Sequence, residues 1–302
     1  MNILKILRTR HAPTVASLVA FFFFILPGAG QERDRGFLWR VDSPRTTIYL
    51  LGSIHLARRD MYPLPEAVEK AYRASDVLVL ETDINKLTPA MARSMSGQTT
   101  YFPPDRIQNH LSAGALEKLN RVLTDLEIPI ESVQAYRPSA LAAMLLNTKL
   151  MHLGYEPAYG IDRHFLLQAK GQKTILGLET PLFQTRLLRE LSDAAPNDES
   201  HLLSQLEDVR STETRMSSIV SAWKKGDLSA MESIIFTPDQ NEYQTRMMER
   251  LFFSRNRNMS QKISHLLDGR KICFVVVGSG HLVGNQSIPT LLRTMGYPVK
   301  QL

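Results

Sequence analysis

The stretch Thr46-Thr47-Ile48-Tyr49-Leu50-Leu51-Gly52-Ser53-Ile54-His55-Leu56 decides the fold, since an apolar β-rich run leads directly into Gly-Ser-x-His-Leu. The stretch Val276-Val277-Gly278-Ser279-Gly280-His281-Leu282 carries the same pattern after another apolar run. Each residue type in this motif makes up only a few per cent of an average protein. The probability that the motif follows two apolar runs by chance is therefore below about one per cent. Each glycine lets the chain turn sharply after its strand. The repeat therefore predicts two strands that each end in a functional histidine.

The segments between these stretches predict an α/β fold. Residues 63–74 are predicted to form a helix, and the apolar residues 77–80 a strand that ends at Glu81. Strand, helix and strand within about 35 residues form a βαβ unit, so we expect the two strands to be parallel. Two further strands are predicted at residues 173–178, ending at Glu179, and at residues 271–277.

The rest of the chain is predicted to be mostly helical. Expected helices cover residues 112–126, 138–153, 162–171, 199–224, 227–235, 240–268 and 288–295, and a short strand follows at 298–301. No linker divides the chain in two. We therefore expect one domain over residues 31–302, with a central, mostly parallel sheet flanked by helices and a large helical insert.

Composition excludes several classes of protein. The chain has 302 residues, of which 43% are hydrophobic and 22% charged, as in ordinary globular proteins. The single cysteine, Cys273, excludes an intramolecular disulfide and any metal site built from cysteines. The net charge is +6, but no dense run of Lys and Arg with interleaved aromatic residues occurs, so we expect no nucleic-acid partner.

Residues 1–30 resemble a secretory signal peptide. Lys5, Arg8 and Arg10 precede an apolar run over residues 15–26, and small residues follow at 28–30. That run is shorter than the ~20 residues that span a bilayer as a helix. We expect cleavage near Gly30 and a periplasmic or secreted protein, with an uncleaved N-terminal anchor as the alternative. No later apolar run is long enough for a transmembrane helix in the mature chain.

Four predicted strands end in residues that can do chemistry, namely His55, Glu81, Glu179 and His281. Ligands of open α/β sheets bind outside the carboxyl ends of the strands, so these side chains are expected at one edge. Two imidazoles and a carboxylate can bind a divalent ion and leave positions open for water or substrate. The alternative is that each histidine packs against the sheet and bonds a carbonyl.

The neighbouring polar residues have competing interpretations. Glu81 is a metal ligand, a general base or a salt-bridge partner, while Glu179 suits either the site or the N-terminus of the helix at Pro181. Asp162 is expected as a helix N-cap in preference to a catalytic group. Ser53 and Ser279 either bond local backbone or hold a ligand group.

Several motifs resemble those of the TraB/PrgY/GumN family, which is related to the Tiki metalloproteases, and the resemblance covers about residues 36–302. The matching stretches are Tyr49-Leu50-Leu51-Gly52-Ser53-Ile54-His55, Tyr62-Pro63-Leu64-Pro65, Leu80-Glu81-Thr82-Asp83, Tyr159-Gly160-Ile161-Asp162, Leu178-Glu179-Thr180-Pro181, Arg255-Asn256-Arg257-Asn258-Met259 and Val277-Gly278-Ser279-Gly280-His281-Leu282-Val283-Gly284.

The resemblance implies a fold like that of the erythromycin esterase and ChaN proteins. It also implies a divalent metal, manganese or cobalt with zinc as an alternative, and peptide hydrolysis as in the Tiki branch. Carried over by motif, His55, Glu81 and His281 match the catalytic set. Arg255 matches the arginine of the Arg-Asn-x-x-Met segment. No other cofactor is implied.

We therefore predict an exported metal-dependent hydrolase, a peptidase acting on a peptide or small molecule. His55 and His281, with Glu81 as a further ligand or as the general base, would hold an ion that acidifies water. Arg255 would stabilise the oxyanion. The histidines lack the spacing of His-Glu-x-x-His proteases, and neither serine lies in Gly-x-Ser-x-Gly. The alternative is a non-catalytic periplasmic protein that sequesters a peptide, haem or metal. No motif indicates an oligomeric state.

Overall fold

The computed structural model describes residues 35–83, 86, 88–94, 99–194, 196, 198–236 and 242–302. The predicted signal peptide, residues 1–30, lies outside these ranges. None of the helices within them has the length and apolar composition needed to cross a bilayer.

In the described part of the chain, six strands form one sheet in the order β4-β3-β5-β2-β1-β6. The strands are β1 (Leu38–Asp42), β2 (Thr47–Ser53), β3 (Val77–Thr82), β4 (Thr174–Glu179), β5 (Cys273–Gly278) and β6 (Val299–Gln301). β2, β3, β4 and β5 run parallel, while β1 is antiparallel to both β2 and β6. The predicted α/β class, with its mostly parallel sheet, is confirmed.

The strand β5 lies between β2 and β3, which are parallel as predicted but not neighbours. In the register of β2 and β5, Ser53 lies opposite Gly278. The two Gly-Ser-x-His-Leu motifs therefore leave the sheet side by side. All six residues of β5 are buried, as expected for the apolar centre of a sheet that is covered on both faces.

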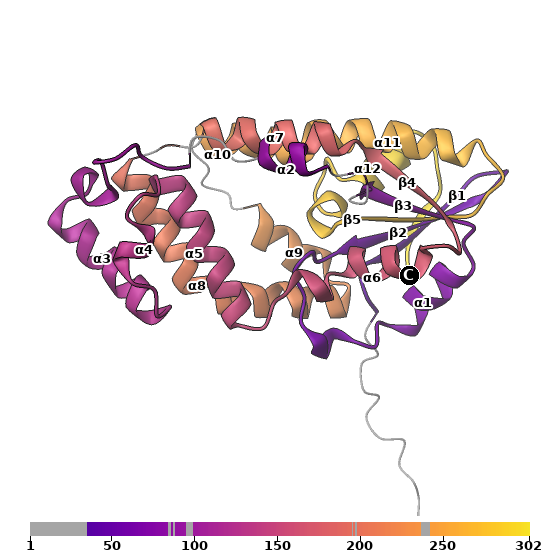
Figure 1. The fold of residues 1–302 in the computed structure, drawn as a ribbon. Helices are drawn as coiled ribbons and strands as arrows, with labels where there is room; N and C mark the ends of the chain where they lie inside the picture. The colour runs from indigo at the N-terminus through magenta and orange to yellow at the C-terminus, as the bar shows by residue number, and fades with distance from the viewer. Residues whose placement is uncertain are drawn as a thin grey trace, which may run out of the picture. The chain divides into compact units, whose positions relative to one another are not determined.

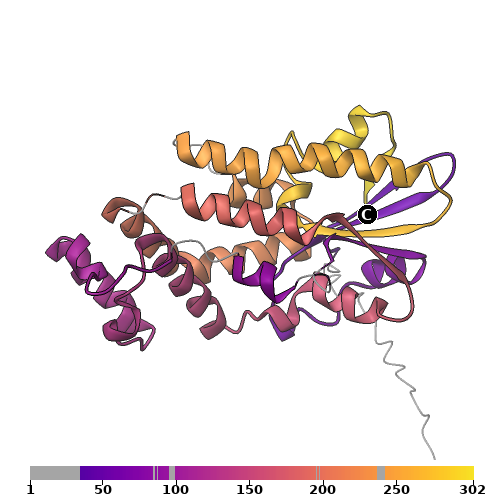
Figure 2. The same cartoon turned by 45° about the horizontal axis from the view of Figure 1, so that its top comes forward.

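Helices cover both faces of the sheet. Figure 1 shows α1 (Glu66–Arg73) and α6 (Ile161–Ala169) below the sheet, and α11 (Ser254–Leu267) and α12 (Ile288–Thr294) above it. α7 (Pro181–Ala194) leaves the end of β4 and runs beside the α10–α11 helix in both views (Figures 1 and 2). The core between these layers includes Leu50, Val79, Phe165, Phe274 and Ile263.

The predicted helical insert has its own apolar core. α3 (Ala113–Asp125), α4 (Ile130–Val133) and α5 (Pro138–His152) pack with the first half of α8 (Glu199–Lys225) around residues such as Leu119, Leu145 and Leu206. Ser112 caps α3 by accepting a hydrogen bond from the Ala115 N–H. Gly154, with φ of 79°, follows the end of α5. Both boundaries agree with the sequence signals.

The remaining elements are short or join the two cores. They are η1 (Arg59–Met61), α2 (Pro89–Ser94), η3 (Ile107–His110), η4 (Pro157–Tyr159), α9 (Leu228–Ile235), α10 (Glu242–Met248), the π-helical turn η5 (Glu249–Phe253) and η6 (Ser279–Leu282). The helix predicted over residues 240–268 is thus α10, η5 and α11 in succession. The π turn lies directly before Arg255, and such turns often occur at functional sites.

Candidate functional site

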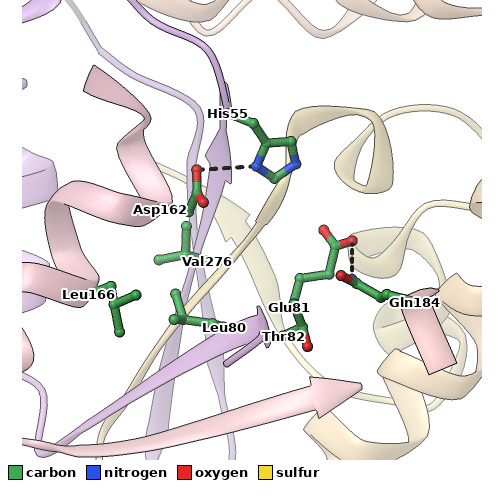
Figure 3. Close-up of a pocket in the computed structure, with 8 residues that line it drawn as sticks. All are labelled: His55, Leu80, Glu81, Thr82, Asp162, Leu166, Gln184 and Val276. Atoms are coloured by element: carbon green, nitrogen blue, oxygen red, sulfur yellow. Dashed lines mark hydrogen bonds and ion pairs between the residues drawn. The ribbon is translucent and has the colours of Figure 1, made fainter. Parts of the chain in front are cut away.

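A cavity of about 230 Å³ lies at the carboxyl ends of the parallel strands. Its lining consists of His55, Leu80, Glu81, Thr82, Asp162, Leu166, Gln184 and Val276 (Figure 3). Leu80, Leu166 and Val276 form the apolar part of this lining. The polar part combines His55, which follows β2, with Glu81 and Thr82 at the end of β3, Gln184 from α7 and Asp162 from α6. The cavity lies where the sequence predicted the functional edge of the sheet.

His55 follows β2 and is held by a carboxylate. Its Nδ1 lies 3.1 Å from Asp162 Oδ1, and the side chain is 55% exposed. Because the carboxylate accepts, Nδ1 carries the hydrogen and Nε2 is left to face the site. Partial loss of water disfavours the imidazolium, but the hydrogen bond to Asp162 and the nearby negative charges outweigh it. They raise the pKa of His55 to about 9.

His281 lies in η6 after β5 and is almost fully buried. Its Nδ1 is 2.5 Å from Asn256 Oδ1, and the Asn256 amide nitrogen donates to the Gln286 carbonyl at 2.8 Å. That second bond orients the Asn256 amide, so its oxygen accepts from Nδ1 and the Nε2 of His281 faces Glu81 Oε2 at 3.7 Å. Burial lowers the pKa of His281 to about 4, despite the opposing charge of Glu81.

The two motif serines hold the two histidine loops together. Ser279 Oγ donates to the Ser53 carbonyl at 3.0 Å. Ser53 Oγ donates to Asp162 Oδ1 at 2.8 Å and accepts from the Asp162 N–H at 3.3 Å. Of the two roles predicted for these serines, the structure has them bonding protein groups. The Gly-Ser pair after each strand therefore connects β2, β5 and the start of α6.

Asp162 is not the N-cap of α6, which corrects the sequence-based expectation. The N-cap is Gly160, and Asp162 lies within the first turn of the helix. A β-carbon at Gly160 would collide with the His55 carbonyl oxygen, so only glycine allows this close approach. The Asp162 carboxylate bonds Ser53 and His55, because the helix begins directly against the histidine loop.

Glu81 and Glu179 are bridged by Arg255, a buried residue of α11. The Arg255 Nε and Nη2 donate to the two oxygens of Glu179 at 2.9 and 2.8 Å, and Nη2 also donates to Glu81 Oε1. Its Nη1 donates to the Leu251 carbonyl at 2.8 Å. The guanidinium is thus engaged with protein oxygens through all three of its nitrogens.

The surroundings of the Glu81 carboxylate strongly favour its ionised form. Its Oε2 accepts from the Gly278 N–H at 3.1 Å. Burial alone would raise the pKa of Glu81, but the neighbouring His281 and Arg255 outweigh burial and hold that pKa at about 2. This carboxylate is therefore ionised at neutral pH and faces both histidines.

Two site residues were missed by sequence reasoning, Gln184 and Asn256. Gln184 lies on α7 and donates to Glu81 Oε1 and Glu179 Oε2, each at 3.1 Å. Asn256 follows Arg255 in the Arg-Asn-x-x-Met segment, so that segment could have indicated a role for it. Nothing local singled out Gln184. His164, two residues from Asp162, lies outside this cavity and contacts Glu69 and Gln168.

The donor groups around Gly278 fit a divalent cation in chemical type. A β-carbon at Gly278 would lie 3.3 Å from His55 Nε2, 3.6 Å from His281 Cδ2 and 3.7 Å from Glu81 Oε2, so the three side chains surround one space. Each imidazole has its Nδ1 held by a neighbour, which makes Nε2 the ligand atom; on His55 the ion must first displace the Nε2 proton, because the pKa of that ring is raised. The carboxylates of Glu81, Glu179 and Asp162 outnumber the one guanidinium.

The side chains are not at ligand distances as they stand. Within the described ranges, no group of three or more His, Cys, Asp or Glu side chains is close enough to hold a metal ion. Binding would therefore require His55, His281 and Glu81 to approach one another. His55 is the most exposed of the three and the one with most room to move.

Sequence comparisons identify relatives of this chain. The chain is 27% identical over 250 residues to the uncharacterized protein YbaP of Escherichia coli K12, covering 81% of this chain and 87% of YbaP. The same figures hold for YbaP of Shigella flexneri. The metalloprotease TIKI2 of Danio rerio is 22% identical over 327 residues, covering 89% of this chain and 61% of TIKI2. No solved structure shows a significant match.

A family model matches residues 37–301, which include every strand of the sheet and every residue of the cavity. The matched region begins just before β1 and ends with the last residue of β6. The chain therefore belongs to the TraB/PrgY/gumN family.

Proposed function

We propose that this protein is a metal-dependent hydrolase that cleaves peptide bonds. The observation that carries the proposal is the space beside Gly278, which His55 Nε2, His281 and Glu81 Oε2 surround. The distant similarity to a protein named as a metalloprotease supports the same reading. His55, His281 and Glu81 would hold the ion, with manganese or cobalt expected and zinc as an alternative.

A bound divalent ion would polarise the substrate carbonyl and make water more acidic. The other contributions come from side chains of the protein. Glu81 Oε2 is ionised, which suits a ligand of the ion; as the general base it would be weak, because its pKa is held at about 2. Asp162 and Asn256 keep the Nε2 atoms of His55 and His281 directed at this space. The apolar lining of Leu80, Leu166 and Val276 excludes water beside it.

We assign Arg255 to the positioning of Glu81, in place of the predicted oxyanion contact. Its Nε and both Nη groups already donate to oxygens of Glu81, Glu179 and Leu251. A planar guanidinium can hold two carboxylates at once, which a point charge cannot. Arg255 thus keeps Glu81 Oε2 turned toward the histidines.

Cleavage of a pool of short synthetic peptides tests the proposal. We expect products with added Mn²⁺ or Co²⁺, loss of cleavage with a chelator, and recovery when the metal is returned. Mass spectrometry of the products measures this. Peptide or metal binding without any cleavage, under all metals tried, would instead support the alternative of a non-catalytic binding protein.

The variant Gly278→Ala provides a sharper test of where the ion binds. Gly278 has φ of −54°, which alanine adopts without strain, so the added methyl acts only on the space between the ligands. We expect metal affinity and cleavage to fall about tenfold or more, since overpacking of this kind costs 1–3 kcal/mol.

Isothermal titration with Mn²⁺ measures the affinity of this variant. Gly114→Ala is the matched control, because nothing lies within 4 Å of a β-carbon at that helical glycine. Unchanged metal binding in Gly278→Ala would place the ion elsewhere.

We also propose that the protein is exported and acts in the periplasm or outside the cell. The basic residues, the short apolar run and the small residues at 28–30 support this. The intact mass of the protein from a periplasmic fraction is expected to correspond to a chain that starts near Gln31. A cytosolic protein that retains residues 1–30 would contradict the proposal, and a membrane-bound full-length chain would indicate the uncleaved anchor.

A further inference from the structure

The Gln184 side chain has an orientation that the surrounding charges determine. Its Nε2 lies 3.1 Å from Glu81 Oε1 and 3.1 Å from Glu179 Oε2. Both neighbours are carboxylate oxygens that already accept from Arg255, and an ionised carboxylate can only accept. If the amide were turned over, its carbonyl oxygen would face two acceptors with no hydrogen between them. The NH₂ group therefore faces the carboxylates and uses both of its hydrogens there.

The consequence is an acceptor that has no protein donor. With both hydrogens of Nε2 used, the Oε1 of Gln184 is left, and Gln184 lines the cavity (Figure 3). Among the residues that the structure describes, no N–H or O–H donates to this oxygen. Water can satisfy it in the free protein, but a molecule that fills the cavity must replace that water or lose the hydrogen bond.

The rest of the cavity indicates what the missing donor is attached to. The other polar side chains of the lining are the carboxylates of Glu81 and Asp162, the His55 imidazole and the Thr82 hydroxyl, and its apolar part is Leu80, Leu166 and Val276. A volume of about 230 Å³ takes an aliphatic side chain together with the backbone atoms beside it. Such an occupant brings an N–H of a peptide group.

We propose that Gln184 Oε1 accepts a hydrogen bond from a substrate N–H and so makes the site prefer a molecule that carries this N–H over the matching ester or N-methyl amide that lacks it. The proposal rests on the proposed function, because it names what the same cavity recognises. A site built to bond an N–H discriminates against an analogue that lacks it, since the protein acceptor is then left unpaired. Gln184 would thus be a specificity-determining residue that contacts substrate.

Three small probes test this without turnover. N-acetyl-leucine methylamide carries two N–H groups, its methyl ester lacks the second, and its N-methyl-leucine analogue lacks the first. Binding to every variant is followed by titration of ¹⁵N-labelled protein without added metal, using the backbone amide resonances that shift; in the parent protein the side-chain amide resonance of Gln184 is followed as well. That resonance is identified by its loss in Gln184→Met.

We expect the methylamide to bind the parent protein about fivefold or more tightly than one of the other two probes, the scale of one hydrogen bond. In Gln184→Met this preference should vanish, while binding of the weaker probe is retained. Gln172→Met, at an exposed glutamine in the turn after α6, is the matched control and should keep the preference. The circular dichroism spectra of all variants verify that each is folded.

Three results would overturn the proposal. They are equal binding of all three probes, a preference that survives in Gln184→Met, and no binding up to about 50 mM probe. Because no metal or cleavage is involved, these results leave the proposed hydrolysis untouched. Conversely, a protein that binds the methylamide selectively but cleaves no peptide would contradict only the proposed function.

Discussion

His55→Ala and His281→Ala are each expected to lose most of the bound metal, and the double variant is expected to be little worse than either. The two histidines follow adjacent parallel strands, with Ser53 opposite Gly278 in the register of β2 and β5. Neighbouring strands are about 4.8 Å apart, so both side chains can reach one ion. Loss of a ligand should cost more than about 100-fold in affinity, since residues that only support ligands contribute 10- to 100-fold.

Metal stoichiometry and affinity, measured on folded protein for both single variants and the pair, check this expectation. Histidines with separate structural roles would give additive losses of stability and no change in metal content. His152→Ala is a suitable control, because that histidine is exposed at the end of α5 and far along the chain from the site. Full metal occupancy in either single variant would remove the shared site and the mechanism with it.

Arg255→Lys is expected to lower the rate of cleavage by about 10²-fold or more. Metal affinity should fall by about 10- to 100-fold where Glu81 is a ligand of the ion, and should stay unchanged where Glu81 is only the general base. Lysine keeps the positive charge but cannot donate to Glu179 through two nitrogens and reach Glu81 as well. Glu81 would then lose the contact that holds its other oxygen toward the histidines. A reduction of this size is typical when one preorganised polar contact is lost at a reacting centre.

The same substitution should also lower stability, because Arg255 is only 6% exposed and the side chains of its partners Glu179 and Glu81 are 6% and 14% exposed. Breaking a buried ion pair completely costs about 3–5 kcal/mol, and lysine should recover part of that. Steady-state kinetics, metal analysis and urea unfolding of the variant measure the three quantities. Arg257→Lys, an exposed arginine two residues along the same helix, is the control. If Arg255→Lys cleaved peptides at the rate of the parent protein, Arg255 would have only a packing role.

Local sequence alone determined the main strands and where they end. An apolar run followed by a glycine or a carboxylate predicted β2, β3 and β5, because buried parallel strands are apolar throughout. The same pattern predicted β4, although it lies at the edge of the sheet and only its last two residues are buried. Two helix ends were predicted for equally local reasons. Ser112 supplies a side-chain oxygen to a free N–H at the start of α3, and Gly154 adopts the positive φ needed after the end of α5. The carboxyl-edge rule then brought His55, His281 and Glu81 together.

Only the tertiary structure decided how these ends combine. The sequence did not indicate β1, nor that β5 enters between β2 and β3, because strand order depends on packing across the whole sheet. It assigned Asp162 to a cap, whereas the close approach of Gly160 to the His55 loop turns that carboxylate toward His55. Gln184 and Asn256 escaped notice because their roles consist of hydrogen bonds to residues that are distant in sequence. The spacing of apolar residues that predicts helices and strands carries no information about such contacts, which exist only when the chain has folded.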